Sequence, residues 1–306
     1  MVAEAGHYDR VVDGHAFELV TSDGRRLEGW ASVGTSPTAV LLHVGTPGAG
    51  IAYEPWVAEV AARGLRFVTY SRPGYAGSSR RPGRVVADCA DDVAAIAGRL
   101  GLDRLHVVGW SGGGPHALAS AALLPQLVAS AATLAGVAPR DAAGLDWLDG
   151  MAEENRDEFG AALEGAGRLE PFLLDAAEAM GDSTGDTIAE ALGGLVTEVD
   201  RQALHGPFSD YLSAVMRGAL RDGIWGWHDD DLAFARAWGF AVDDVGVPVT
   251  IWQGREDAMV PYAHGVWLSR HVTGATARLF DREGHLSLAL RFGEIVDDML
   301  ARAGTT

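Results

Sequence analysis

The sequence predicts an α/β fold: a mostly parallel, doubly wound sheet of about eight strands with an inserted helical cap. Short apolar runs rich in β-branched residues alternate with stretches at helical spacing over residues 1–137, and again over 242–306. A glycine-rich turn joins one of these strands to a helix at residues 109–113. Between 138 and 241, strand-like runs largely disappear and helical spacing prevails. The chain therefore divides into an α/β core, 1–137 and 242–306, and a cap, 138–241, inserted after the sixth strand.

Strands and helices alternate through the first half of the chain. Two strands joined at Ser22, Asp23 and Gly24 predict an antiparallel hairpin at the edge of the sheet. The later strands should run parallel, so that their carboxyl ends share one edge, where catalytic groups gather. The expected strands are 16–20, 26–33, 39–44, 67–71, 105–108 and 129–136, and the expected helices are 53–64, 84–100 and 113–125.

The inserted segment is acidic, and glycine and proline separate its helical pieces. We expect these pieces to cover the carboxyl edge of the sheet, because about a hundred residues of short helices would bury little core alone. An unrelated second domain is the alternative. The expected cap helices are 146–164, 170–180, 186–204, 208–221 and 230–238, the last strands are 248–254 and 275–280, and the last helices are 262–271 and 285–302.

Composition narrows the range of partners. The net charge of −18 disfavours nucleic acid and anionic membrane surfaces. All 24 residues of the Lys and Arg class are Arg, so a Schiff-base lysine is excluded. The single cysteine, Cys89, has no partner for an intrachain disulfide.

The sequence also bears on the location of the protein. Neither a signal-peptide pattern nor an apolar run long enough to span a membrane is visible. We expect a cytoplasmic protein that binds a small-molecule substrate without cofactor or metal, with a homodimer left open.

The turn at residues 109–113 carries the main chemical signal. It reads Gly-Trp-Ser-Gly-Gly, preceded by a strand and followed by a helix, which is the arrangement of a nucleophile elbow. Such a turn lifts the hydroxyl of Ser111 above the sheet edge, where it can attack a substrate. A glycine-rich strand-to-helix turn with an incidental serine is the alternative.

A serine nucleophile needs a base, and the base needs an acid that orients it. His285 follows the last strand and Asp257 follows the strand before it, so both should reach the edge that holds Ser111. The chain has ten histidines, but His285 is the one placed on a loop at this edge downstream of an acid. Glu256 and Asp141 are the alternatives for the acid.

A tetrahedral oxyanion requires two backbone N–H donors. One is expected at Gly112, directly after the serine, and the other on the loop 45–48, where we select Thr46. The alternative for this loop is a Pro-Gly turn without a catalytic part.

These motifs resemble those of the α/β-hydrolase-fold serine hydrolases with a helical cap, of the esterase and lipase type. The resemblance covers residues 16–302 and rests on Gly-Trp-Ser-Gly-Gly, Gly-Thr-Pro-Gly, Arg-Pro-Gly-Tyr-Ala-Gly-Ser, Asp-x-x-Val-Pro and Gly-His. It implies Ser111 as nucleophile, Asp257 as acid and His285 as base, with Thr46 and Gly112 as oxyanion donors. A serine at the elbow argues against epoxide hydrolases and haloalkane dehalogenases, which use an aspartate there.

Two positions depart from the pattern of many relatives. Val44 stands where a histidine is common, and Ser71 stands where an aspartate is common. The departure at Val44 alters the support of the loop that carries Thr46, and the departure at Ser71 likewise bears on the stability of the loop it precedes.

The cap should determine the substrate. Aromatic residues gather near its end, and they either pack the cap onto the core or form a pocket wall. Trp225, Trp227 and Trp238 are the candidates for substrate contact there, together with Trp110 beside the nucleophile. The run Asp229-Asp230-Asp231 is expected to be a solvated N-terminal turn of a helix and not a metal site, because consecutive helical residues point in different directions.

The expected activity is hydrolysis of a small, mostly apolar carboxylic ester through an acyl-enzyme. Cleavage of a C–C, amide, lactone or thioester bond by the same three residues is an alternative, as is a cyclase or acyltransferase. A ligand-binding protein with little turnover on the same fold is the alternative from another class.

Overall fold

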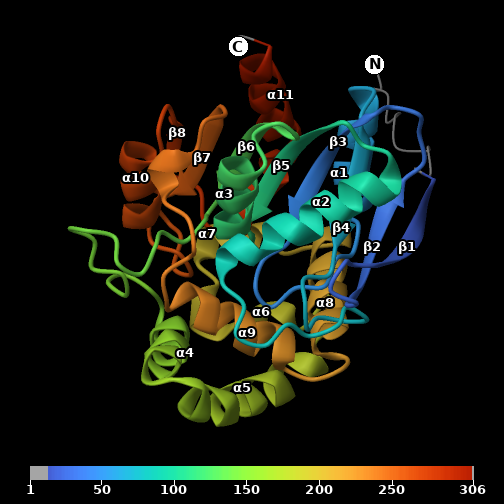
Figure 1. Cartoon of the computed structure of the whole chain (residues 1–306). Helices are drawn as coiled ribbons and strands as arrows, with labels where there is room; N and C mark the ends of the chain where they lie inside the picture. Colours follow the sequence, from blue (N-terminus) through green and yellow to red (C-terminus); the bar gives the residue numbers. More distant parts are fainter. Residues whose placement is uncertain (1–12, 305–306) are drawn as a thin grey trace, which may run out of the picture.

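The computed structural model describes residues 13–304, and within that range it contains an eight-stranded sheet with helices on both faces (Figure 1). The strand order is β1-β2-β4-β3-β5-β6-β7-β8. The predicted fold class is confirmed, and each expected strand is present with small shifts at its ends. Residues 1–12 of the predicted core lie outside the described part of the chain. The strands are β1 (Gly14–Val20), β2 (Arg26–Ser32), β3 (Thr38–His43), β4 (Arg66–Tyr70), β5 (Arg104–Trp110), β6 (Val128–Leu134), β7 (Val249–Gly254) and β8 (Thr276–Phe280).

The pairing of the strands brings distant loops to one edge. β1 and β2 form the predicted antiparallel hairpin, and β2 is also antiparallel to β4, whereas the remaining neighbours are parallel. Leu42 of β3 pairs with Val108 of β5, which pairs with Ala132 of β6. Because these central strands end side by side, the loops that follow them meet at the carboxyl edge.

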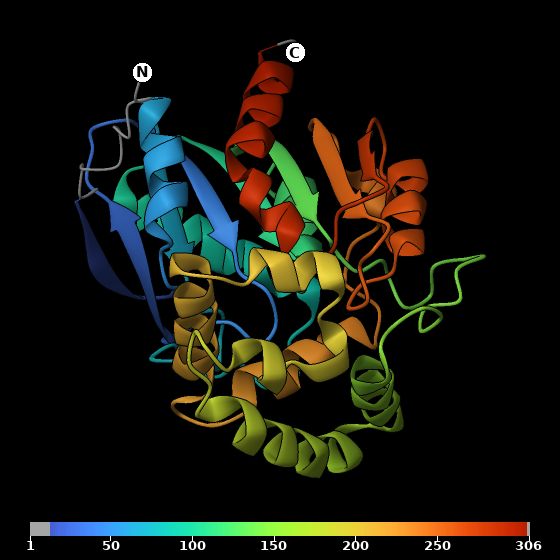
Figure 2. The same ribbon diagram turned by 180° about the vertical axis from the view of Figure 1, so that it is seen from behind.

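Helices cover both faces of the sheet. α2 (Cys89–Leu100) and α3 (Gly113–Leu123) lie in front of it in Figure 1, and α1 (Glu54–Ala62) and α11 (Phe292–Ala303) lie in front in the reverse view of Figure 2. α10 (Tyr262–His271) packs on β7 and β8. The apolar face predicted for α2 is buried in the core through Cys89, Val93 and Ile96, and each aliphatic side chain of this kind stabilises the fold by about 1.5–3 kcal/mol.

A helical segment follows β6 and lies at the carboxyl edge of the sheet (Figure 2). Two of its expected helices are shorter than predicted. The first begins at Glu153, because residues 146–152 form turns that include Gly150 at φ +84°. The third is broken into two at Gly193, which has φ +55°, a conformation that favours glycine. The helices are α4 (Glu153–Glu164), α5 (Ala166–Gly181), α6 (Ile188–Ala191), α7 (Glu198–Ala203), α8 (Pro207–Leu220) and α9 (Trp225–Phe234).

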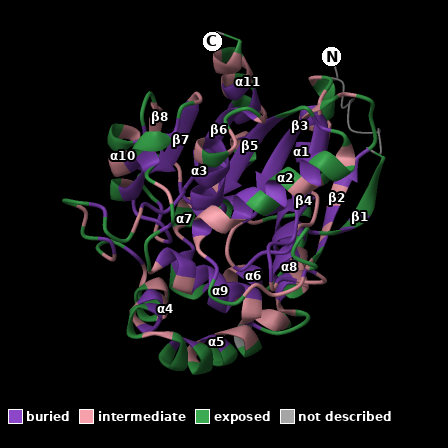
Figure 3. Ribbon diagram, viewed as in Figure 1, coloured by how far each residue is buried: buried purple, intermediate pink, exposed green. Residues whose placement is uncertain are grey.

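The helical segment shares its apolar contacts with the core. Phe208 and Val215 of α8 belong to the same buried cluster as Trp56 of α1 and Trp110 of β5. Tyr75, on the loop after β4, is buried among side chains of α5, α8 and α9. Figure 3 shows the sheet and the inner helices buried, and the outer faces of α4 and α5 exposed. Among the helices between residues 13 and 304, none has the length and hydropathy needed to cross a bilayer.

Helix α9 is buried on nearly every side although it carries three consecutive aspartates. The prediction of a solvated N-terminal turn is wrong: Asp229, Asp230 and Asp231 are 3%, 0% and 0% exposed, and the helix begins one turn earlier, at Trp225. Since successive residues on a helix point in different directions, each carboxyl meets a different neighbour. Asp229 accepts two hydrogen bonds from Arg80, at 2.8 Å each.

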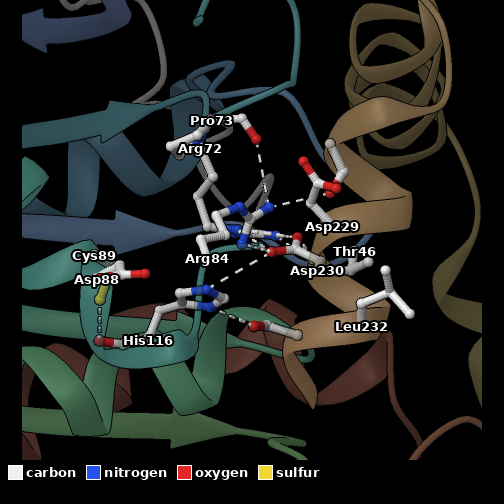
Figure 4. A network of polar contacts seen from close by, with 12 residues as sticks. Thr46, Arg72, Pro73, Arg84, Asp88, Cys89, His116, Asp229, Asp230 and Leu232 are labelled. Atoms are coloured by element: carbon white, nitrogen blue, oxygen red, sulfur yellow. Dashed lines mark hydrogen bonds and ion pairs between the residues drawn. The ribbon is translucent and has the colours of Figure 1, made fainter. Parts of the chain in front are cut away.

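Asp230 is the centre of a buried ion cluster (Figure 4). Its carboxylate accepts hydrogen bonds from Arg72 Nη2 and Arg84 Nη1 at 2.6 Å each, from Thr46 Oγ1 at 2.8 Å and from Tyr75 Oη at 2.9 Å. We call these five residues the Asp230 cluster. Burial opposes ionisation of the carboxyl, but the two guanidinium groups outweigh burial and hold the pKa of Asp230 well below its usual value.

Replacing Asp230 with alanine should therefore destabilise the fold. Asp230→Ala leaves Arg72 and Arg84 buried without their counter-ion, so the free energy of unfolding should fall by about 3–5 kcal/mol. Asp222→Ala is the matched control, because the Arg221–Asp222 pair has both side chains 58% exposed and its loss should cost about 0.5 kcal/mol. Urea denaturation of the three proteins measures both effects. Equal stability of the two variants would contradict a structural role for the cluster.

Candidate active site

Ser111 lies on a tight turn between β5 and α3. Its φ is +55°, which is uncommon for a residue with a side chain. Two backbone hydrogen bonds hold this conformation, from the Ser111 N–H to Leu134 O and from the Gly114 N–H to Ser111 O, both at 2.8 Å. Close packing explains the flanking glycines: a Cβ at Gly109 would lie 2.2 Å from Gly113 O, and one at Gly113 would lie 2.1 Å from His43 O.

The structure brings His285 and Asp257 together. His285 Nδ1 lies 2.9 Å from Asp257 Oδ2 and 3.2 Å from Oδ1. The backbone N–H groups of Met259 and Val260 donate to Asp257 Oδ1, and Gln253 Nε2 donates to Oδ2, which fixes the carboxylate. Because a carboxylate only accepts, His285 carries its proton on Nδ1 and presents Nε2 as the basic nitrogen.

The two alternative acids lie elsewhere. Glu256 and Asp141 are both exposed to solvent, whereas Asp257 is 6% exposed and in contact with His285. Burial alone would lower the pKa of His285. The negative charge of Asp257, the hydrogen bond to Asp257 and the negative charge of Asp200 together outweigh burial and raise that pKa above its ordinary value.

A carboxylate from the helical segment holds the loop that carries His285. Asp200 of α7 is fully buried and accepts hydrogen bonds from the backbone N–H groups of His285, Leu286 and Ser287, at 2.9, 2.8 and 2.9 Å. A Cβ at Gly284 would lie 2.4 Å from Asp200 Oδ1, so this approach requires glycine. Trp110 Nε1 adds a hydrogen bond to His285 O at 3.2 Å.

Ser111 lines two adjoining cavities. One, of about 50 Å³, is lined by His285 and Trp110, and the other, of about 80 Å³, is lined by Gly112, Glu158 and Trp227. Within residues 13–304, no hydrogen bond joins Ser111 to His285, although both line the first cavity. Such bonds are often long in a site without substrate and shorten when it binds.

The loop after β3 and the turn after β5 present two free backbone donors beside Ser111. Thr46 and Gly112 both line the second cavity, and a Cβ at Gly112 would lie 2.3 Å from Thr46 Oγ1. In the described part of the chain, neither the Thr46 N–H nor the Gly112 N–H donates to another protein group. Unpaired N–H groups of this kind can donate hydrogen bonds to a negatively charged oxygen.

Arg72 supports the Thr46 loop in this chain, which lacks the histidine and the aspartate that many relatives carry at positions 44 and 71. Its guanidinium donates to the carbonyl oxygen of Val44, and to Gly45 O and Thr46 Oγ1 at 2.9 Å each. Val44 itself is buried among apolar side chains, and Ser71 Oγ accepts a hydrogen bond from the Gly50 N–H at 3.0 Å. The altered support that the sequence predicts for this loop is therefore Arg72, which Asp230 holds in turn.

The four tryptophans selected from the sequence have different positions. Trp110 lines the first cavity and Trp227 lines the second. Trp225 and Trp238 line neither of these two cavities: Trp225 stacks on the Arg80 guanidinium at 4.1 Å, and Trp238 packs against Phe240 with ring centroids 5.9 Å apart. The aromatic residues near the end of the helical segment thus both form part of a cavity wall and pack the segment onto the core.

Several residues around the site were not selected from the sequence. Asp200 and Glu158 have no local pattern that distinguishes them from surface charges, whereas Arg72 opens the Arg-Pro-Gly-Tyr-Ala-Gly-Ser motif but was given no role. A signal did exist for Asp230: three adjacent aspartates on one helix cannot all face solvent if the helix packs against the core, so one needs a cation.

Comparisons with known proteins agree with this architecture. A family model described as alpha/beta hydrolase fold matches residues 38–291. The chain is 30% identical over 260 residues to a pimeloyl-[acyl-carrier protein] methyl ester esterase of Aromatoleum aromaticum, covering 81% of this chain and 91% of that protein.

Two solved structures show the same fold. The esterase from Exiguobacterium antarcticum has a TM-score of 0.65 at 19% identity and covers 93% of this chain and 98% of its own. The bromoperoxidase from Bacillus anthracis has a TM-score of 0.67 at 20% identity and covers 94% and 100%. With its family match over most of the chain, this protein belongs to the α/β-hydrolase-fold family.

Proposed function

We propose that the protein is a serine hydrolase that cleaves a small, mostly apolar carboxylic ester through an acyl-enzyme. The observation that carries this proposal is the convergence of three loops: Ser111 and His285 line one cavity, and His285 bonds to Asp257. The esterase relative supports an ester as the substrate.

In the proposed mechanism, Ser111 Oγ attacks the ester carbonyl while His285 Nε2 takes the hydroxyl proton. Asp257 keeps the other ring nitrogen protonated and stabilises the imidazolium that forms. His285 then gives the proton to the leaving alcohol, and water releases the acid by the same steps in reverse order. The N–H groups of Thr46 and Gly112 bind the oxyanion.

The two cavities suit the two halves of a small ester. Both are lined by Ser111, and they share Met216 and Met259, so we propose that one holds the acyl group and the other the alcohol. Their walls are mainly apolar, including Phe159, Phe234 and Leu212. We propose that the helical segment acts as a cap, because α4, α8 and α9 provide much of these walls.

Removing the hydroxyl of Ser111 should abolish covalent labelling. A fluorophosphonate probe reacts with an activated serine, so Ser111→Ala should show no labelling and no hydrolysis of p-nitrophenyl butyrate above background. Ser269→Ala on α10, whose hydroxyl donates to Val266 O, is the control and should label like the wild type. Labelling of Ser111→Ala at the wild-type rate would refute the assignment.

The pH dependence of hydrolysis should follow the protonation of the His285 imidazole. The imidazole accepts a proton only when neutral, and its pKa is raised above 6.5, the ordinary value. For p-nitrophenyl butyrate, kcat/KM should therefore fall as the pH drops through a midpoint above 6.5. An acidic limb centred below that value would point to a different base.

The Thr46 hydroxyl should act by positioning its own N–H. Thr46→Val keeps the backbone donor but removes the bonds to Asp230 and Arg72, so kcat should fall by about 10- to 100-fold with little change in KM. Thr46→Ser keeps the hydroxyl and should restore most of kcat. A change confined to KM would instead indicate a contact with the substrate ground state.

A further inference from the structure

A carboxyl group in the wall of the second cavity meets another carboxyl group that lies behind the wall. Glu158 of α4 lines this cavity, and Asp231 of α9, 0% exposed, lies in hydrogen-bonding contact with it. Trp227 Nε1 donates to Glu158 Oε1 at 2.8 Å. Among residues 13–304, neither carboxyl forms an ion pair, and no N–H group donates to either oxygen of Asp231. The protein thus brings together a fully buried acid and a half-buried one without a counter-ion.

Both members of such a pair lose their protons at a higher pH than an ordinary carboxyl group does. Burial is the largest influence and raises the pKa of Glu158 to about 7, although the Trp227 N–H and Asp231 oppose it. Burial and the Glu158 carboxyl raise the pKa of Asp231 well above its ordinary value. The other charges that act on the pair from neighbouring elements in the described chain are Asp230, which raises the pKa of Asp231, and Arg84, which lowers it.

The arrangement places one proton on the carboxyl group that lines the cavity. With both acids neutral, one proton bridges the two carboxyls, and the second has no acceptor in the protein. Glu158 Oε1 already accepts from Trp227, and Glu158 is the member of the pair that lines the cavity. A neutral carboxylic acid held in an apolar site is a hydrogen-bond donor to a substrate oxygen.

We propose that Glu158 and Asp231 form a specificity subsite that donates a hydrogen bond to a neutral oxygen atom, such as a ketone oxygen, of the group bound in the second cavity. The inference rests on the proposed function, because it assigns a substrate class to the same cavity. It selects oxygenated esters over purely hydrocarbon ones, since a buried donor left without an acceptor is unfavourable.

Binding to the Ser111→Ala protein tests the subsite without turnover. Methyl levulinate and methyl valerate differ by a ketone oxygen in the acyl chain, and calorimetry or NMR titration measures both. At about pH 6, where the pair is neutral, levulinate should bind about tenfold more tightly. The preference should decrease as the pH rises through about 7, because the carboxylate then formed no longer donates.

Variants in the same background separate the subsite from packing effects. Glu158→Leu should remove the preference at every pH. Glu158→Gln keeps an N–H donor, so its preference should persist and become independent of pH. Asp157→Asn, at an exposed neighbouring position on α4, is the control and should retain the wild-type preference and its pH dependence.

Three results would overturn the inference. These are equal affinity for the two esters at the lower pH, a preference that Glu158→Leu leaves intact, and tighter binding of the methyl ester of γ-aminobutyrate, which would assign the pair to a cation. If the wild-type protein hydrolyses p-nitrophenyl butyrate in each case, the proposed function stands and only the subsite fails. If the preference for levulinate is observed but Ser111 of the wild-type protein is not labelled by the fluorophosphonate, the subsite stands and the proposed function fails.

Discussion

The ion cluster around Asp230 joins the helical segment to the loop beside Ser111. Arg72 donates both to the carbonyl oxygens of that loop and to Asp230, so the loop's support is complete only when α9 is docked. A buried ion pair contributes little net stability compared with apolar packing of the same volume. Its contribution is directional, because a guanidinium with several fixed acceptors allows few positions for the loop that carries Thr46.

Helix α9 also shows how the placement of arginines affects the ionisation of neighbouring aspartates. Asp229 meets the partly exposed Arg80, and Asp230 meets two buried guanidinium groups. Asp231 meets another carboxyl, that of Glu158. Three chemically identical side chains in sequence thus include one whose pKa is lowered and one whose pKa is raised, because only their surroundings differ.

The sequence predicts the sheet well because its signals are local. Strand runs such as 39–44 and turns such as 109–113 are recognised from periodicity and glycine. The parallel register of β7 and β8 then brings together Asp257 and His285, which follow these strands. The helical segment is harder to predict. Its breaks at Gly150 and Gly193 depend on positive φ values that composition does not reveal. The burial of Asp230 depends on Arg72, more than 150 residues away, so no window of sequence contains both partners.

The helical segment contributes to the order of the site as well as to the walls of its cavities. Asp200 of α7 binds three successive N–H groups of the His285 loop, and Asp230 of α9 fixes the Thr46 loop through Arg72. Both the proposed base and a proposed oxyanion donor therefore take their positions from carboxylates outside the sheet. A segment exchanged for one with the same apolar lining but without these two aspartates would leave buried donors on both loops unsatisfied. The constraint on this part of the chain is thus electrostatic as well as steric, and it allows the cavity walls to vary more freely than the two aspartates.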